Sequence, residues 1–155
     1  MKLLKYLVLA AVVTVPVYAA RQGTNPAAKP APADQPITVY KTATCGCCGK
    51  WVDHLKAAGF APTVHVVLTT DAAPPAKGVP TSLRSCHSAT LEGYTVEGHV
   101  PADVIRQLLK ERPKIAGIAV PGMPAGSPGM ESPNPVKYDV IAYDATGKTS
   151  VFARK

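Results

Sequence analysis

The chain has 155 residues and a net charge of +7, and 46% of its residues are hydrophobic but only 6% aromatic. The basic residues are scattered, with no arginine-rich run and no interleaved aromatic residues, which argues against a surface that stacks nucleic-acid bases. Three of the four cysteines fall within four residues, so sulfur chemistry is the first thing that the sequence has to explain.

Residues 1–19 have the pattern of a secretory signal peptide. Lys2 and Lys5 form a short basic start, residues 3–17 are almost wholly apolar, and the small residues Val17 and Ala19 precede a cleavage point. The alternative is a membrane anchor, but the apolar run falls short of the roughly 20 residues that a span needs. We therefore predict export to the bacterial periplasm, with no membrane insertion of the mature domain. Secretion from a eukaryotic cell is the alternative destination.

A linker and one domain follow. Residues 20–36 are rich in Ala and Pro and lack a hydrophobic period, which predicts a solvated, disordered linker. Residues 37–155 remain as one domain, a length at which a chain can bury a single hydrophobic core. The expected elements are a strand at 37–41, a helix at 47–58, strands at 63–68, 82–86 and 91–96, a helix at 102–111, a Gly/Pro loop at 119–131, and strands at 138–143 and 149–153.

This order predicts an α/β domain with a thioredoxin-like fold, extended by a carboxyl-terminal Gly/Pro/Met loop and a β-hairpin. That fold keeps a Cys-x-x-Cys pair where its first strand meets its first helix, and Cys45 and Cys48 have this spacing at this junction. Val79-Pro80-Thr81 also resembles the cis-proline segment that faces the pair in thioredoxin-like proteins. Gly59 is placed to end the first helix.

The strongest candidate site is the string of thiols at the start of that helix. The amides and dipole of a helix amino terminus favour thiolate, which prepares Cys45 and Cys48 for disulfide exchange or metal binding. Cys47 distinguishes disulfide exchange from metal binding, because a redox pair has no use for a third thiol whereas a soft-metal site gains a bridging ligand. The alternatives are that Cys47 is a small buried hydrophobic residue, or that two structural disulfides, Cys45–Cys48 and Cys47–Cys86, staple the domain.

Three further candidates are expected at the same end of the fold. Cys86 should approach the thiols from the strand that follows Val79-Pro80-Thr81. His87 comes directly after Cys86, so both can reach one site only if the strand ends or bulges there. His99 precedes the last helix, and a surface position without a role is its alternative. The remaining histidines, at positions 54 and 65, are assigned no role.

Met123 and Met130 lie in the Gly/Pro loop. Thioether sulfur is a Cu(I) ligand that zinc rarely uses, so we predict that the loop folds over the thiols, with both methionines as outer ligands or as a lid. The glycines of the loop would allow close backbone approach. The alternative is a pair of apolar plugs that close the loop onto the core.

Several short motifs occur together along the domain. They are Val39-Tyr40-Lys41, Cys45-Gly46-Cys47-Cys48-Gly49-Lys50-Trp51, His54-Leu55, Ala58-Gly59-Phe60, Gly78-Val79-Pro80, Ser85-Cys86-His87, Glu92-Gly93-Tyr94, Val96-Glu97-Gly98-His99-Val100-Pro101, and Pro121-Gly122-Met123-Pro124 with Gly126-Ser127-Pro128-Gly129-Met130-Glu131. The combination resembles the CopG-type family of periplasmic copper-resistance proteins, long catalogued as a domain of unknown function. The resemblance implies a thioredoxin-like fold, copper at the cysteine cluster and a role in copper tolerance.

The leading hypothesis is therefore a periplasmic copper-binding protein of copper resistance with a multinuclear Cu(I)–thiolate site. Its candidate metal ligands are Cys45, Cys47, Cys48, Cys86, His87, His99, Met123 and Met130. The copper would be sequestered, passed to periplasmic copper export or resistance proteins, or used as a Cu(I)/Cu(II) couple, which leaves open whether the protein is an enzyme. The second hypothesis is a periplasmic thiol–disulfide oxidoreductase that uses Cys45 and Cys48. The third is a disulfide-stapled binding module without chemistry.

Overall fold

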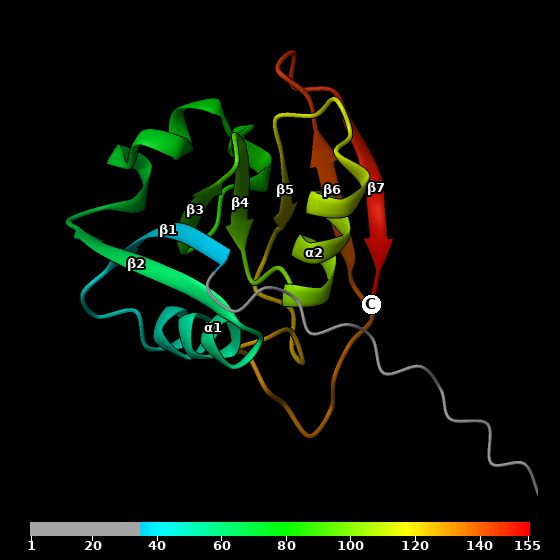
Figure 1. Cartoon of the computed structure of the whole chain (residues 1–155). Helices are drawn as coiled ribbons and strands as arrows, with labels where there is room; N and C mark the ends of the chain where they lie inside the picture. The colour runs from blue at the N-terminus through cyan, green and yellow to red at the C-terminus, as the bar shows by residue number, and fades with distance from the viewer. Residues whose placement is uncertain (1–34) are drawn as a thin grey trace, which may run out of the picture.

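A seven-stranded mixed sheet runs through residues 35–155, the part of the chain that the computed structural model describes (Figure 1). The elements are β1 (Gln35–Thr42), α1 (Gly46–Ala57), β2 (Phe60–Val67), the short 3-10 helices η1 (Thr70–Ala72), η2 (Pro74–Gly78) and η3 (Thr81–Leu83), β3 (His87–Leu91), β4 (Tyr94–Gly98), α2 (Ala102–Glu111), β5 (Gly117–Val120), β6 (Asp139–Tyr143) and β7 (Thr149–Arg154). The predicted signal peptide and nearly all of the predicted linker lie outside the described residues.

The strand order is β2-β1-β3-β4-β5-β6-β7. Two neighbouring pairs are parallel, β1 with β2 and β4 with β5, and each is joined through a helix, as parallel strands require. The other pairs are antiparallel. As a result β1, β4 and β5 run in the same direction and β3 runs against them. The carboxyl ends of β1, β4 and β5 and the amino end of β3 therefore meet at one edge of the sheet.

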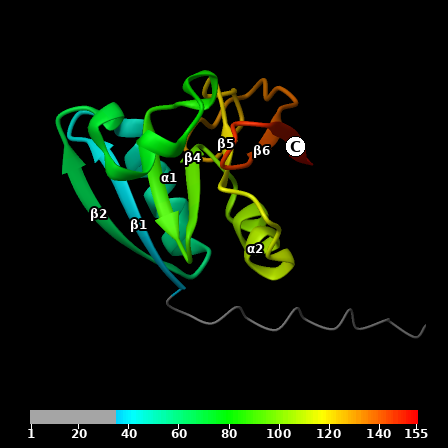
Figure 2. The same cartoon turned by 90° about the horizontal axis from the view of Figure 1, so that it is seen from above.

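Both helices cover the same face of the sheet. Trp51 and Leu55 of α1 and Ile105 and Leu108 of α2 share one buried apolar cluster with sheet residues such as Val39. Figures 1 and 2 show α1 beside β1 and β2, and α2 toward β5 and β6. The opposite face is covered in part by the 3-10 segment, through a smaller cluster of Val79, Leu83, Ala119 and Tyr143. No helix within residues 35–155 is long and apolar enough to cross a membrane.

Most of the predicted elements are present within two or three residues of their expected bounds. Gly59 has a φ of 81° and follows the carboxyl-terminal cap of α1, so the predicted helix end is confirmed. Helix α2 ends at Glu111, and its carboxyl-terminal cap is Arg112, which has a left-handed backbone conformation directly before Pro113. The hairpin of β6 and β7 is confirmed as well.

The middle of the domain differs from the prediction. The strand expected at 82–86 is absent, because Pro80 begins a 3-10 turn in which the Leu83 amide donates to the Pro80 carbonyl at 2.8 Å. The strand expected at 91–96 is shifted, because Glu92 and Gly93 both have positive φ and form the hairpin turn between β3 and β4.

Two further expectations are corrected. The Gly/Pro loop was expected from residue 119, but Gly117–Val120 forms β5, a four-residue strand buried on both faces. The described residues contain no cis peptide bond, so the bond before Pro80 is trans. Val79 packs against Ala119 on the face of the sheet opposite the helices, so the proposed analogy with a cis-proline segment beside the cysteines is wrong.

Candidate metal centre

Cys45 lies at the junction between β1 and α1. It is the amino-terminal cap of α1, and its sulfur accepts a hydrogen bond from the Cys48 amide at 3.3 Å. No acidic residue lies in the first turn of the helix, so nothing there opposes the stabilisation of a thiolate by the helix amino terminus. Cys45 and Cys48 are joined in a disulfide, and Cys47 and Cys86 are free thiols.

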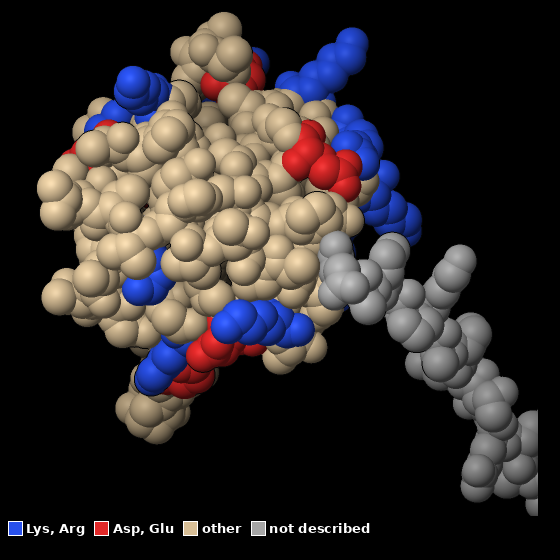
Figure 3. Space-filling model, turned by 60° about the vertical axis from the view of Figure 1, so that its left-hand side comes forward, with Lys and Arg blue, Asp and Glu red and all other residues tan. Residues whose placement is uncertain are grey.

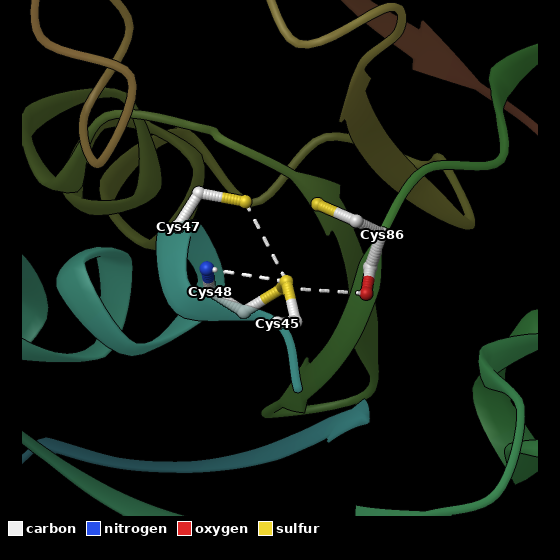
Figure 4. Close-up of side chains that lie close together, drawn as sticks. All are labelled: Cys45, Cys47, Cys48 and Cys86. Atoms are coloured by element: carbon white, nitrogen blue, oxygen red, sulfur yellow. Dashed lines mark hydrogen bonds between the residues drawn. A yellow bond between two sulfur atoms is a disulfide. The ribbon is translucent and has the colours of Figure 1, made fainter. Parts of the chain in front are cut away.

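All four cysteine sulfurs lie within 4.8 Å of one another (Figure 4). The Cys47 sulfur is 3.5 Å from that of Cys45, which has no hydrogen in the disulfide, so the Cys47 thiol is the donor. The Cys48 sulfur is 3.4 Å from the carbonyl oxygen of Cys86. This is a contact in the disulfide form and can be a hydrogen bond only once the disulfide is reduced. The sulfurs of α1 therefore face the chain segment that enters β3.

Cys86, His87 and His99 form a second group that shares Cys86 with the first. Strand β3 starts at His87, so Cys86 lies just outside it, and both residues can turn to the same place. The Cys86 sulfur is 3.4 Å from His87 Nδ1 and 3.1 Å from His99 Nε2. His99 follows the end of β4 and is buried, so it is not a surface histidine.

The two imidazoles are enclosed by the core. The ring of His87 lies 4.3 Å from that of Trp51 and 4.8 Å from that of His99, measured between centroids. Burial, and then the neighbouring His99, lower the pKa of His87 to about 3. Burial also lowers the pKa of His99. Both rings are therefore neutral near pH 7, the form in which imidazole binds metals. His87 Nε2 is buried and has no hydrogen-bond partner.

Burial, and after it the nearby Cys47, raise the pKa of Cys86 to about 11. Without a metal, Cys86 is therefore a thiol at pH 7. Its proton can be donated to His99 Nε2, which is the closest acceptor. A bound cation would take the place of this proton, because a thiol must be deprotonated to act as a metal ligand.

The loop after β5 lies against the first turns of α1, but its two methionines lie in different surroundings. Met130 lines a hollow of about 490 Å³, together with Cys47 and Lys50 from the first turns of α1. Met123 is 43% exposed and does not line this hollow. The sequence therefore placed the loop in the right region, but the structure brings only Met130 to the neighbourhood of Cys47.

Sequence reasoning missed Glu97. Its side chain is buried in β4, where one oxygen accepts a hydrogen bond from the Ser85 amide at 2.7 Å and the other accepts one from the Ser88 hydroxyl. Burial raises the pKa of Glu97 to about 7, against the lowering effect of these bonds. One carboxyl thus holds the chain on both sides of Cys86-His87. The available signal was an acidic residue placed directly after Val96 and before Gly98.

His54, which was assigned no role, has a structural one. Its Nε2 accepts a hydrogen bond from the Ala102 amide at 3.1 Å, and so caps α2, whose own cap residue is Pro101. His65 stacks on Tyr40, away from the thiols, on the outer strand β2. Seen from the left of Figure 1, the middle of the surface carries few charged side chains, and most of those in view lie toward its rim (Figure 3).

Two solved structures match the chain over most of its length. They are forms 1 and 2 of a protein described as "Copper resistance protein copG", and each is 45% identical to this chain. Each match covers 77% of this chain and 96% or 97% of the solved chain, with a TM-score of 0.72. The chain belongs to the CopG family of copper-resistance proteins.

A family model described as "Protein of unknown function, DUF411" matches residues 83–130. This segment of the CopG fold contains Cys86, His87, His99 and both methionines of the loop, but not the thiols of α1. A search of curated protein sequences finds no match.

Proposed function

We propose that this protein binds copper in bacterial copper resistance and holds it as Cu(I) bridged by the thiolates of Cys45, Cys47, Cys48 and Cys86. One observation carries the proposal: four sulfurs gather within 4.8 Å, and one of them also belongs to a group with two neutral imidazoles. Thiolate and imidazole together suit Cu(I). Four sulfurs are more than a single disulfide requires, and bridging lets them serve more than one copper ion.

The nitrogen and thioether ligands belong to the same proposal. His99 offers Nε2 and His87 offers Nδ1, both directed at the Cys86 sulfur. Met130 is the better candidate for an outer ligand, because it lines the hollow that contains Cys47. Met123 would need the loop to rearrange before its sulfur could take part.

Copper loading would begin from the reduced protein. In the disulfide form Cys45 and Cys48 supply no thiolate, and only Cys47 and Cys86 remain as free thiols. Reduction by an external thiol therefore raises the number of available sulfur ligands from two to four. A copper centre at this position would be sensitive to the redox state of its compartment.

The proposal extends to fold, location and partners. The strand order β2-β1-β3-β4, with Cys45 and Cys48 between β1 and α1, supports assignment of residues 37–155 to a thioredoxin-like domain, with β5, the loop and the β6–β7 hairpin added. We place the mature domain in the periplasm, after a signal peptide at 1–19 and a linker at 20–36. Copper ions are the primary ligand, and copper export or resistance proteins are the expected exchange partners.

A thiol–disulfide oxidoreductase is the second candidate function, and the disulfide between Cys45 and Cys48 favours it. The pair lies at a helix amino terminus, where a thiolate is stabilised. The two proposals differ over Cys47, which exchange chemistry does not need and a bridged copper site does.

Titration of the reduced, full-length mature protein with Cu(I), in competition with a coloured chelator under anaerobic conditions, tests the main proposal. We expect more than one equivalent of Cu(I) to be held by each chain. A protein that binds no Cu(I) but reduces a disulfide substrate or oxidises a dithiol substrate would instead support the oxidoreductase.

A further inference from the structure

Gly129 is the point at which the loop comes closest to the candidate metal centre. It is buried with a φ of +87°, and a Cβ added there would lie 2.6 Å from the Cys47 carbonyl oxygen and 3.0 Å from the Trp51 amide nitrogen. The same Cβ would lie 3.3 Å from His99 Nδ1. Only glycine therefore allows the loop backbone to reach both α1 and His99.

The carbonyl just before Gly129 fixes the proton of the His99 ring. His99 Nδ1 is 2.8 Å from the Pro128 carbonyl oxygen, which can only accept a hydrogen bond. Nδ1 must therefore carry the hydrogen, and in the neutral ring Nε2 keeps a free lone pair. That lone pair points to the Cys86 sulfur at 3.1 Å. In metal-binding histidines, the ring nitrogen that does not bind the metal commonly donates its N–H to a carbonyl in this way.

The loop holds this carbonyl in place through its own hydrogen bonds. The buried Ser127 hydroxyl donates to the Pro124 carbonyl at 2.7 Å, and the Met130 amide donates to the Ser127 carbonyl at 2.8 Å. The Gly129 amide donates to the Glu131 carboxylate at 2.7 Å. These hydrogen bonds within the loop therefore fix the position of the Pro128 carbonyl that accepts from His99.

We infer that Pro128 and Gly129 are positioning residues, which keep His99 in the tautomer whose Nε2 is free to bind a metal beside Cys86. The inference rests on the proposed function for its purpose, and it moves the contribution of the loop from its methionine sulfurs to its backbone. His87 Nε2 makes no hydrogen bond of this kind, since it is buried without a partner.

Two glycine substitutions in the same loop test the inference. Gly129→Ala introduces the close contacts, whereas Gly122→Ala is the matched control: Gly122 also has a positive φ, of +76°, but a Cβ there meets nothing within 4 Å. The readout is the ¹⁵N shifts of the His99 ring nitrogens in the reduced, metal-free protein. We expect a proton held on Nδ1 in the parent and in Gly122→Ala, and a mixture of tautomers in Gly129→Ala.

The parent spectrum alone can overturn the inference, since a proton on His99 Nε2 would contradict it. So would a Gly129→Ala protein that keeps the Nδ1–H form, or a Gly122→Ala protein that loses it. If Gly129→Ala does not fold, Ser127→Ala, which loosens the loop without adding a clash, should show the mixture instead, and an unchanged Nδ1–H form there counts against the inference.

The affinity for Cu(I), measured by competition with a chelator, links the tautomer to the proposed function. We expect Gly129→Ala to weaken Cu(I) binding about 10- to 100-fold, the usual effect of losing an outer-shell partner of a ligand, and Gly122→Ala to bind as the parent does. If the parent binds no Cu(I), the proposed function fails. The tautomer measurement is independent of that result, because it is made without metal.

Discussion

The two groups of candidate ligands that share Cys86 are built differently. Cys45, Cys47 and Cys48 lie in the first turn of one helix, where local sequence alone brings three sulfurs together. Cys86, His87 and His99 come from two strand ends and are placed by β3 and β4. The first group is partly exposed and changes with redox state, whereas both imidazoles of the second are buried and neutral.

This difference suggests a division of roles. The helix group can gain or lose two thiolates through its disulfide, so it controls how many sulfurs are available. The strand group has fixed rings and one fixed tautomer, so it sets where a metal can bind. Cys86 joins them, and substitutions on either side should have separable effects.

The largest effect is expected at Cys86, the candidate ligand that both groups share. Cys86→Ser should weaken Cu(I) binding by more than about 100-fold, beyond the 10- to 100-fold loss typical of outer-shell partners, because both groups lose a sulfur. Chelator competition on the reduced protein measures this loss. Circular dichroism of the metal-free variant provides the control for folding. Binding equal to that of the parent would show that the two groups do not act together.

Cys47→Ser separates copper binding from disulfide exchange. We expect fewer copper ions per chain, because a bridging sulfur is lost, while the Cys45–Cys48 disulfide still forms since Cys47 is not part of it. Metal analysis and free-thiol counting measure the two properties on one sample. If stoichiometry is unchanged, Cys47 is only a packing residue and the oxidoreductase is favoured.

The two methionines of the loop should differ. Met130→Leu keeps the side-chain volume but removes the thioether that lines the same hollow as Cys47. The rate at which the protein loses copper to a chelator should therefore rise several-fold. Met123→Leu is the matched control on the exposed part of the loop and should leave the rate unchanged. Equal rates in both variants would make Met130 an apolar plug.

Glu97 tests how the group of Cys86, His87 and His99 is held in place by the strands. Glu97→Ala should lower the free energy of unfolding by about 2–4 kcal/mol, because the Ser85 amide and the Ser88 hydroxyl both lose their acceptor. Glu97→Gln keeps an acceptor for the Ser85 amide and should recover much of this loss. Urea unfolding of the metal-free protein measures both, and equal stability of Glu97→Ala and the parent would contradict the role of the carboxyl as a clamp.

The smallest effect is expected at His54, outside both groups. Burial lowers its pKa in the folded protein, so the unfolded chain takes up the proton first as pH falls below about 6.5. The stability that His54 contributes is therefore present above that pH and is lost on acidification. His54→Gln keeps an acceptor for the Ala102 amide and should flatten this fall, whereas His54→Ala should cost about 1 kcal/mol at pH 7.5 through loss of the helix cap.

Unfolding of these variants between pH 5 and pH 8 checks the prediction. His65→Gln, on the outer strand β2, controls for the loss of a histidine elsewhere. A His54→Gln profile as steep as that of the parent would mean that other groups carry the acid sensitivity.

Local signals account for what the sequence could predict. The spacing of Trp51 and Leu55 on one helix face and the Gly59 stop predicted α1, and the thiols followed from its position. The errors came where long-range packing decides. Nothing local marks Pro80 as the start of a 3-10 turn, and the four-residue β5 is too short to show a period, so its strand pairing alone defines it.

The same distinction applies to the candidate site. The sequence identified Cys86, His87 and His99 as candidate ligands but could not show how they approach one another, because the register of β3 and β4 sets that geometry. The Pro128 carbonyl could not be found at all, since every residue has one and only the fold of the loop directs this one at His99.

X-ray absorption at the copper edge, on the reduced protein loaded anaerobically with Cu(I), tests the central claim most directly. A bridged thiolate site predicts sulfur-dominated coordination at about 2.2–2.3 Å, as expected for bonds between thiolates and soft metals, together with a copper–copper scattering distance and more than one copper ion per chain. One copper ion per chain, bound only through nitrogen and oxygen, would contradict it.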